Sequence, residues 1–404
     1  MSTGPAPEAG EVMAAVSCPV CARRVPRGGF CGFCGAHLSP QRGSWAGWWR
    51  FGAYAAAPGE HVLRLSLVSS LFPHLPHRSR AAFRAGAAAV VIVLVVFAML
   101  HWQAPLVAVS ALGFALLFQL YLQESDVYDD LPVPTLALTA AVGAGLGVGW
   151  SLLTGPVAAR SYAAAMGAGP GVSWARVLRE GLAIPLGAAV LMLVPALLVR
   201  MFRPPTRETL DGFLIGSLGA IGFTAASTLT RLAPQLATGP VAPGRTVGGL
   251  LVEAGIQGVA MPVTAAAAGG MVGAALWFRR RTDIPHRLGR HLRPTPLVVI
   301  GVVLAVYAGL GLIDVAPVTP TAQLGLHLVV AAAALLALRV VLHSALLREE
   351  QGLTPGGPLL CAHCAHVVPE MAFCPNCGAA TRASSRSSRA TRRPAPIDTA
   401  PDSP

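Results

Sequence analysis

Eight runs of apolar residues, each long enough to cross a bilayer, most constrain what this chain can fold into. A membrane-spanning helix needs about 20 such residues. Only 12% of the chain is charged, against about 25% of a soluble protein. The sequence therefore predicts an all-α polytopic membrane domain over residues 85–347. The first predicted span is about 85–102, and the second follows it and ends at about 123. The other six are about 135–153, 181–199, 210–230, 247–278, 296–313 and 323–347.

Two of these runs carry further expectations. The sixth, 247–278, is too long for one crossing, so we expect its first part to be amphipathic or re-entrant. In the third, glycines alternate at Gly143, Gly145, Gly147 and Gly149. Small residues at four-residue spacing allow close contact between helices, although a loosely packed span without a specific partner fits the pattern equally well.

The arginines predict how the spans are oriented. All thirty basic residues are arginine, which is typical of a GC-rich bacterial genome. An even number of crossings places both termini on one side, and the short flanks and loops of that side hold thirteen arginines against five on the other. We therefore expect a bacterial plasma-membrane protein with both termini in the cytoplasm. Because these arginines flank apolar spans, the net charge of +12 does not indicate nucleic-acid binding.

Each end of the chain carries two Cys-x-x-Cys pairs separated by nine residues. Four thiolates suit a tetrahedral zinc ion, and Gly35, directly after the first set, permits the turn that aims backbone N–H groups at sulfur. Disulfides are the alternative, which a reducing cytosol disfavours. His363 and His366 are alternative ligands. The predicted ligands of two structural Zn²⁺ ions are Cys18, Cys21, Cys31 and Cys34, and Cys361, Cys364, Cys374 and Cys377.

The segments outside the spans divide by composition. We expect a disordered start at 1–17, a first zinc ribbon at 18–38, a linker at 348–358 and a second ribbon at 359–379. Residues 39–84 are predicted as a juxtamembrane segment, with Trp45, Trp48 and Trp49 at the interface and a short membrane-surface helix over Val62–Phe72. Residues 380–404 are predicted as a disordered basic tail that touches anionic lipid. Arg339, near the end of the last span, is expected to snorkel.

Few ionisable residues lie at membrane depth, where each is a candidate for function. Glu180 is expected to form an ion pair with Arg176 or Arg179. Asp211 is expected to cap the fifth span. Glu253 has no obvious role, and if buried it needs a partner, for which Arg245 and Gln257 are the candidates.

A set of short motifs in the same region belongs together. Leu178-Arg179-Glu180 precedes an apolar span, Thr209-Leu210-Asp211-Gly212-Phe213 opens the next one, and Gly219-Ala220-Ile221-Gly222-Phe223 and Gly269-Gly270 follow. Over about 176–278 this arrangement resembles PrsW-type intramembrane proteases. The resemblance implies a similar helix layout, in which two motifs rich in glutamate and a later histidine gather a metal and activate water within the membrane.

The chain departs from that family at the residues that carry the chemistry. Arg179-Glu180 replaces two glutamates, Ala183 stands at the lysine position, and the motif that begins at Phe223 has Ser227 where the family has glutamate. The histidine position falls at Met261, with Gln257 one turn earlier. A hydrolytic metal site needs about three protein ligands. The positions of this degenerate site are Glu180, Asp211, Phe223, Ser227, Gln257 and Met261.

These features predict a non-catalytic, PrsW-like membrane protein whose zinc ribbons bind a cytosolic protein partner, while the bilayer surrounds the spans. Two alternatives remain. One is an active intramembrane metallopeptidase with atypical site residues, which requires a metal beyond the two ribbon ions. The other is a transporter or channel, in which Glu253, Glu180 and Asp211 line a polar path and the sixth span is discontinuous.

Overall fold

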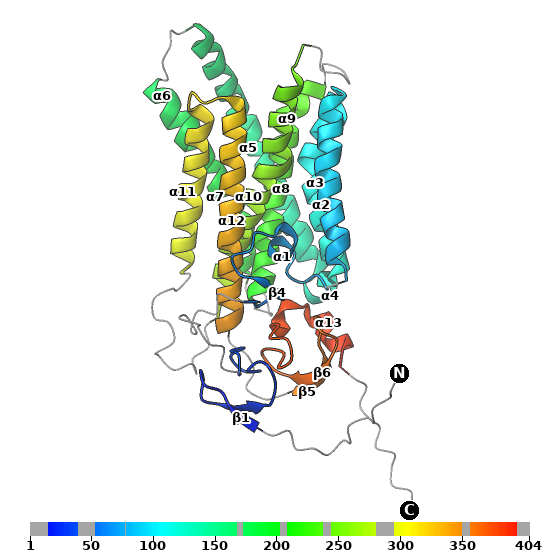
Figure 1. The fold of residues 1–404 in the computed structure, drawn as a ribbon. Coiled ribbons are helices and arrows are strands. Elements are labelled where there is room, and N and C mark those ends of the chain that lie inside the picture. Colours follow the sequence, from blue (N-terminus) through cyan, green and yellow to red (C-terminus); the bar gives the residue numbers. More distant parts are fainter. Residues whose placement is uncertain are drawn as a thin grey trace, which may run out of the picture.

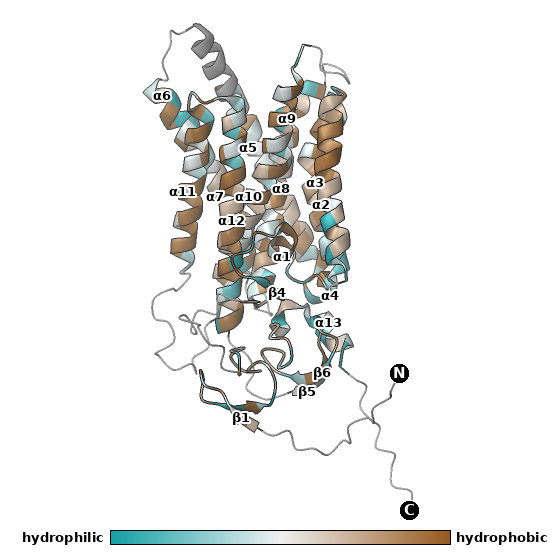
Figure 2. Ribbon diagram, viewed as in Figure 1, coloured by the Kyte–Doolittle hydropathy of each residue, from teal (hydrophilic) through white to brown (hydrophobic). Residues whose placement is uncertain are grey.

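The computed structural model describes residues 15–38, 53–76, 78–167, 173–202, 208–236, 244–279, 295–349 and 356–393. Eight helices in these ranges are long and apolar enough to cross a membrane, which confirms the predicted architecture (Figures 1 and 2). They are α2 (Arg80–Met99), α3 (Gln103–Glu124), α5 (Val133–Gly167), α6–η1–α7 (Trp174–Met201), α8 (Thr209–Leu236), α9–η2–α10 (Val247–Trp277), α11 (Pro296–Val315) and α12 (Pro320–Arg348).

Two of the spanning helices contain a π-helical segment. The fourth comprises α6 (Trp174–Arg176), η1 (Val177–Ala183) and α7 (Ile184–Met201), and the sixth comprises α9 (Val247–Gly255), η2 (Ile256–Ala260) and α10 (Met261–Trp277). Each π segment ends just before a proline, Pro185 or Pro262. A proline cannot donate to the preceding turn and its ring crowds that turn's carbonyl, so a widened turn accommodates it. The sixth span is one continuous helix, so the re-entrant alternative for its first part is wrong. The amphipathic alternative stays open, and α9 buries Leu250 and Ala254, which lie one turn apart on one face.

Helix α8 lies at the centre of the bundle and packs through glycine on two sides. A Cβ atom added at Gly143 or Gly147 of α5 would clash with a backbone oxygen of α8. The same holds between Gly216 of α8 and Gly269 of α10. Of the two alternatives for the third span, close contact is therefore confirmed for Gly143 and Gly147, while a Cβ at Gly145 or Gly149 would meet nothing within 4 Å.

The chain before the first span folds onto the bundle. Strands β3 (Ala53–Tyr54) and β4 (Ala57–His61) form an antiparallel hairpin, and the short helix α1 (Leu67–Leu71) packs against α12 and α2. Val68, Leu71 and Phe72 are all buried. The predicted membrane-surface helix over Val62–Phe72 is thus wrong for Leu67–Leu71, the part that is helical, because protein covers it, whereas Leu63 and Leu65 each expose 55% of their surface. The three tryptophans predicted at the interface lie outside the described residues.

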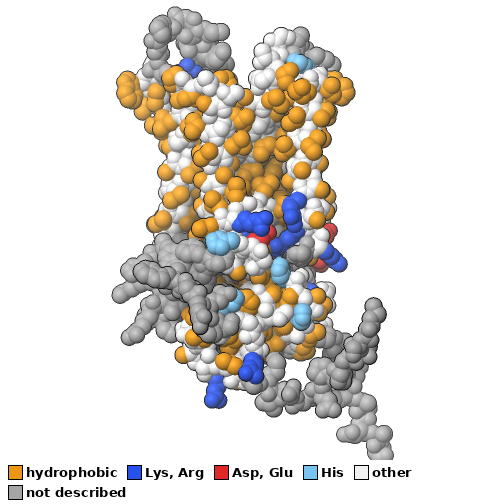
Figure 3. Space-filling model, viewed as in Figure 1, with side chains coloured by type: hydrophobic (Ala, Val, Ile, Leu, Met, Phe, Trp, Pro, Cys, Tyr) orange, Lys and Arg blue, Asp and Glu red, His pale blue; other side chains and the backbone are white. Residues whose placement is uncertain are grey.

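Two small ribbons lie at the same end of the bundle, which we call the ribbon end (Figure 1). The first pairs β1 (Ala15–Ser17) with β2 (Arg24–Pro26), and the second pairs β5 (Gly356–Leu360) with β6 (Val367–Glu370). A 3-10 helix, η3 (Thr381–Ala383), and α13 (Arg386–Thr391) follow the second ribbon. On the face drawn in Figure 3, hydrophobic side chains cover the helices, and most charged ones lie toward the ribbon end.

The predicted disorder from residue 380 onward is therefore wrong for residues 380–393. Four of their five arginines pair with carboxylates of the bundle or of the ribbon, so the segment is held against the protein. The remaining helix at this end, α4 (Val127–Asp130), follows α3 and lies beside α13.

Candidate metal centres

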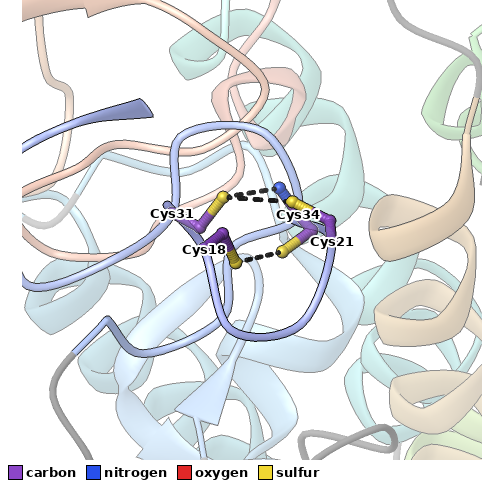
Figure 4. Close-up of side chains that lie close together, drawn as sticks. All are labelled: Cys18, Cys21, Cys31 and Cys34. Carbon is purple, nitrogen blue, oxygen red and sulfur yellow. Dashed lines mark hydrogen bonds between the residues drawn. The ribbon is translucent and has the colours of Figure 1, made fainter. Parts of the chain in front are cut away.

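The eight cysteines form two clusters, and within each cluster the four sulfur atoms lie within 4.8 Å of one another (Figure 4). Cys18 and Cys34 Sγ are 3.6 Å apart, and Cys21 and Cys31 Sγ are 3.8 Å apart. None of the eight forms a disulfide, so the disulfide alternative is wrong. With metal–sulfur bonds of about 2.3 Å, the edges of a tetrahedron are about 3.8 Å, so the sulfurs are already placed for a tetrahedral ion.

The second cluster has the same dimensions as the first. The Sγ–Sγ distances are 3.8 Å both for Cys361 and Cys377 and for Cys364 and Cys374. His366 directs its Nδ1 to the carbonyl oxygen of Cys364 at 2.8 Å. Among the residues that the structure describes, the convergent sets of possible metal ligands contain cysteine alone, so the donor chemistry is that of four thiolates.

Each cluster is shaped by two tight turns. In the first knuckle of each ribbon, Ala22 and Ala365 adopt left-handed φ values of 57° and 56°. Gly35 and Gly378 adopt φ values of 68° and 74° in the second knuckle, as predicted for Gly35. The turns direct backbone N–H groups at sulfur, for instance from Cys34 N to Cys31 Sγ at 3.5 Å.

The electrostatics of the clusters favour a cation. A hydrogen bond from Cys34 lowers the pKa of the Cys31 thiol to about 5, whereas burial raises the pKa of Cys21 to about 11. In the second cluster, a hydrogen bond from Cys374 lowers the pKa of Cys361. The same hydrogen bond raises the pKa of Cys374, which donates it, to about 11. Thiols so close together cannot all ionise by themselves, and a divalent ion removes that conflict.

The two ribbons pack against each other through their second knuckles. Phe30 N donates to Pro375 O, and Phe373 N donates to Gly32 O, both at 2.9 Å. A side chain at Gly32 would clash with Met371 of the opposite ribbon. The sequence contained a partial signal for these hydrogen bonds between the ribbons, because an aromatic residue precedes the second cysteine pair of each ribbon.

Glu180 and Asp211 lie at opposite ends of the bundle. Glu180 is in η1, far from the ribbons (Figure 1), and its carboxylate contacts Arg176 Nε at 3.0 Å and Arg179 at 3.6 Å. The predicted ion pair thus forms with both arginines. Asp211, at the ribbon end, accepts from the backbone N–H of Glu208 at 3.3 Å. This bond is one half of a capping box, so Asp211 does cap the helix, as predicted, but from its third residue.

The other positions of the degenerate family site take part in helix contacts. The backbone oxygen of Phe223 faces Gly147, and the carbonyl of Ser227 accepts from Ser151 Oγ at 3.1 Å. The amide oxygen of Gln257, in η2, accepts from Thr228 at 3.4 Å and from Arg231 at 3.2 Å. Met261 begins α10. None of these six positions belongs to a convergent ligand set in the part of the chain that the structure describes.

Glu253 lies in α9, in the half of the bundle away from the ribbons. Its carboxylate contacts Arg245 at 2.5 Å and accepts from the amide of Gln235 at 3.0 Å. Of the two partners proposed from the sequence, Arg245 is therefore the one observed, and Gln257 bonds elsewhere.

A buried ionic cluster around Arg339 was not expected from the sequence. Its guanidinium is fully buried and donates to Ser69 Oγ at 2.7 Å and to Glu60 Oε2 at 2.8 Å. The ring centroid of Tyr54 lies 4.1 Å from the guanidinium carbon. The prediction that Arg339 snorkels is wrong, because the hairpin and α1 cover it. Burial opposes ionisation of Glu60, but hydrogen bonds from Ser69 and Arg339 lower its pKa overall.

No protein-family model, curated protein or solved structure matches this chain, so the PrsW resemblance remains a prediction from the residues. The chain is a multi-pass helical membrane protein with a four-cysteine cluster at each end.

Proposed function

We propose that this protein is a non-catalytic, PrsW-like scaffold of the bacterial plasma membrane that presents a zinc-bound head to the cytosol, where it binds a protein partner. The head consists of the two ribbons, residues 15–38 and 356–379. The observation that carries the proposal is that two tetrahedral four-cysteine clusters pack together as one unit at one end of the helices. A zinc ion with four cysteine ligands has no open coordination position, so its role is to stabilise a binding surface.

The membrane domain supports a scaffold in a second way. Glu180 and Asp211, the acidic positions of the family site, are at opposite ends of the bundle, and arginines already neutralise both. Bringing them to one metal would require breaking these ion pairs and moving helices that pack through glycine backbones. A rigid bundle with ion pairs at its ends suits a support better than a hydrolytic centre.

The surface of the head favours an acidic partner. Arg24 and Arg27 are exposed on and beside β2 of the first ribbon. Val367, on β6 of the second, exposes 65% of its surface. A head that exposes both cationic side chains and an apolar residue fits a short acidic segment that also carries apolar side chains.

Metal analysis and crosslinking test this proposal together. We expect two zinc ions per chain in purified protein, and crosslinks from the head to a cytosolic protein that disappear in a variant with serine at all eight cysteines. Arg24→Glu with Arg27→Glu should weaken the crosslinks while retaining both zinc ions, and Arg64→Glu, an exposed arginine outside the head, serves as the control. A peptidase activity lost in Glu180→Ala, or a third metal ion ligated by Glu180, would overturn the proposal.

A further inference from the structure

Residues 381–393, which we call the arginine latch, lie between the second ribbon and the bundle (Figure 1). The latch comprises η3 and α13 and contains five arginines. Its two ends are bonded to the second ribbon and its middle to the bundle, so it joins two different parts of the protein.

The second ribbon holds both ends of the latch. At the start, Thr381 N donates to Ala372 O at 3.0 Å. At the end, Leu360 N donates to Arg392 O at 3.1 Å, and the Arg392 guanidinium donates back to Leu360 O at 3.0 Å. Leu360 directly precedes the ligand Cys361, and Ala372 lies two residues before Cys374. The metal cluster and the anchors of the latch are therefore parts of the same small fold.

The bundle holds the charged side chains of the latch. Three arginines reach carboxylates at three positions: Arg382 contacts Glu349 at 3.3 Å, Arg386 contacts Asp211 at 3.0 Å, and Arg389 contacts Glu208 at 2.8 Å. Asp130 of α4 accepts from the first two backbone N–H groups of α13, those of Arg386 and Ser387, at 2.5 and 2.8 Å. The latch thus connects the ends of α4, α8 and α12.

These carboxylates depend on the arginines. The side chains of Glu349 and Asp211 expose only 1% and 7% of their surface. Burial raises the pKa of Glu349, and Arg382 opposes that rise. Removing one partner of a buried ion pair leaves an uncompensated charge, which is strongly unfavourable. Without the latch, the acidic groups at this end of the bundle must therefore separate or hydrate.

Such a rearrangement would reach the central helix. The Glu349 carboxylate also accepts from the backbone N–H of Thr209 at 2.7 Å, which joins the end of α12 to the first turn of α8. Helix α8 in turn packs against α5 and α10 through backbone contacts at glycine. The state of the latch is therefore coupled mechanically to the core of the membrane domain.

We infer that the arginine latch depends on the metal of the second ribbon: with zinc bound, the latch holds α4, α8 and α12 together through Arg382, Arg386 and Arg389, and it releases them when the metal is lost. The inference rests on the proposed zinc site. A ribbon of this size folds only with its metal, so loss of zinc removes the anchors at Leu360 and Ala372. By linkage, the bundle carboxylates must also strengthen zinc binding at the second cluster.

Hydrogen exchange in the full-length protein in lipid nanodiscs tests the inference. Stripping zinc with a chelator should speed exchange at least about tenfold in residues 381–393 and at the Thr209 amide, while the middle of α10 stays protected. Restoring zinc should restore protection. Unchanged exchange at Thr209 and in the latch after verified metal loss would overturn the inference.

A pair of variants separates the latch from the metal site. Glu208→Gln with Asp211→Asn leaves the ribbon intact, so two zinc ions should remain bound while the latch exchanges at least about tenfold faster. Glu370→Gln, which removes the exposed pair with Arg393 on the ribbon itself, should leave Thr209 protected. Protein that never contains zinc would contradict the proposed function. If the protein binds two zinc ions but hydrogen exchange in the latch changes neither in the double variant nor after chelation, the latch inference alone is contradicted.

Discussion

The guanidinium of Arg339 lies 2.8 Å from the carboxylate of Glu60, although 279 positions separate them in the sequence. Arg339 is in the last spanning helix, and Glu60 is in the hairpin before the first one. The pair therefore closes the bundle between its first and last elements. The hairpin and α1 are part of the membrane domain's packed core, beside the head that we propose as the binding surface.

Replacing Arg339 with methionine should destabilise the protein by about 3 kcal/mol, because Glu60 and two serine hydroxyls lose their buried cationic partner. Thermal unfolding in detergent measures the loss. The double variant Arg339→Met with Glu60→Gln should recover part of it, since the uncompensated carboxylate is gone. Arg64→Gln, at an exposed position on the same segment, should change little. Equal losses in the single and double variants would argue against the ion pair.

Cys374→Ser should reduce the zinc content from two ions to one per chain. It should also weaken zinc binding at the first ribbon by about tenfold or more, because the two hydrogen bonds between the ribbons are lost with the fold of the second. Competition with a chelating dye measures both effects. His366→Gln should retain both ions, and loss of one in that variant would show that this histidine is a ligand after all.

Gly216→Val should destabilise the bundle by about 3 kcal/mol or more, because its side chain meets the carbonyl oxygen of Gly269 and forces α8 away from α10. Gly145→Ala is the matched control. An added Cβ there meets nothing within 4 Å, so the helix should gain up to about 1 kcal/mol. Thermal unfolding of both variants checks the contrast, and similar midpoints would contradict the glycine-mediated packing.

Acidification should destabilise the protein through His74, which is buried and lies 2.8 Å from the Tyr121 hydroxyl. Burial, helped by Arg389, lowers its pKa from 6.5 to about 4. Between these values the unfolded chain binds a proton that the folded one does not. Stability is therefore full above about pH 6.5 and falls by up to about 3 kcal/mol toward pH 4.

Unfolding midpoints of the wild type and of His74→Gln across this pH range isolate the effect of His74. Acid also displaces metal from thiolates in both proteins, so the quantity that matters is the difference between their slopes. A wild-type slope no steeper than that of the variant would show that His74 is not responsible.

The spanning helices and the cysteine clusters were accessible from the sequence because each is encoded locally. A long apolar run that crosses a bilayer must be helical, because only a helix satisfies all of its backbone hydrogen bonds internally. Cys18 and Cys21 supply half of the ligands of a metal site within four positions. Pro185 and Pro262 were also visible, and their place inside apolar runs was a usable signal for the π segments.

The latch and the Arg339 cluster were not encoded in that way. Residues 381–393 have the composition of a disordered tail, and only the fold brings Glu208, Asp211 and Glu349 close enough to neutralise three of their arginines. Similarly, nothing near Arg339 in the sequence indicates Glu60. Ion pairs between distant segments leave no periodic pattern, so a single sequence cannot predict them.

The reciprocal bonds between Phe30 and Pro375 and between Phe373 and Gly32 set an order of events during biosynthesis. The first ribbon leaves the ribosome before any of the eight spanning helices, whereas the second ribbon emerges only after all eight have been made. Throughout insertion the early module must therefore wait with Phe30 and Gly32 uncovered. These bonds form only once residues 371–375 have been made, so a chain interrupted before that point leaves Phe30 and Gly32 without their partners on the second ribbon.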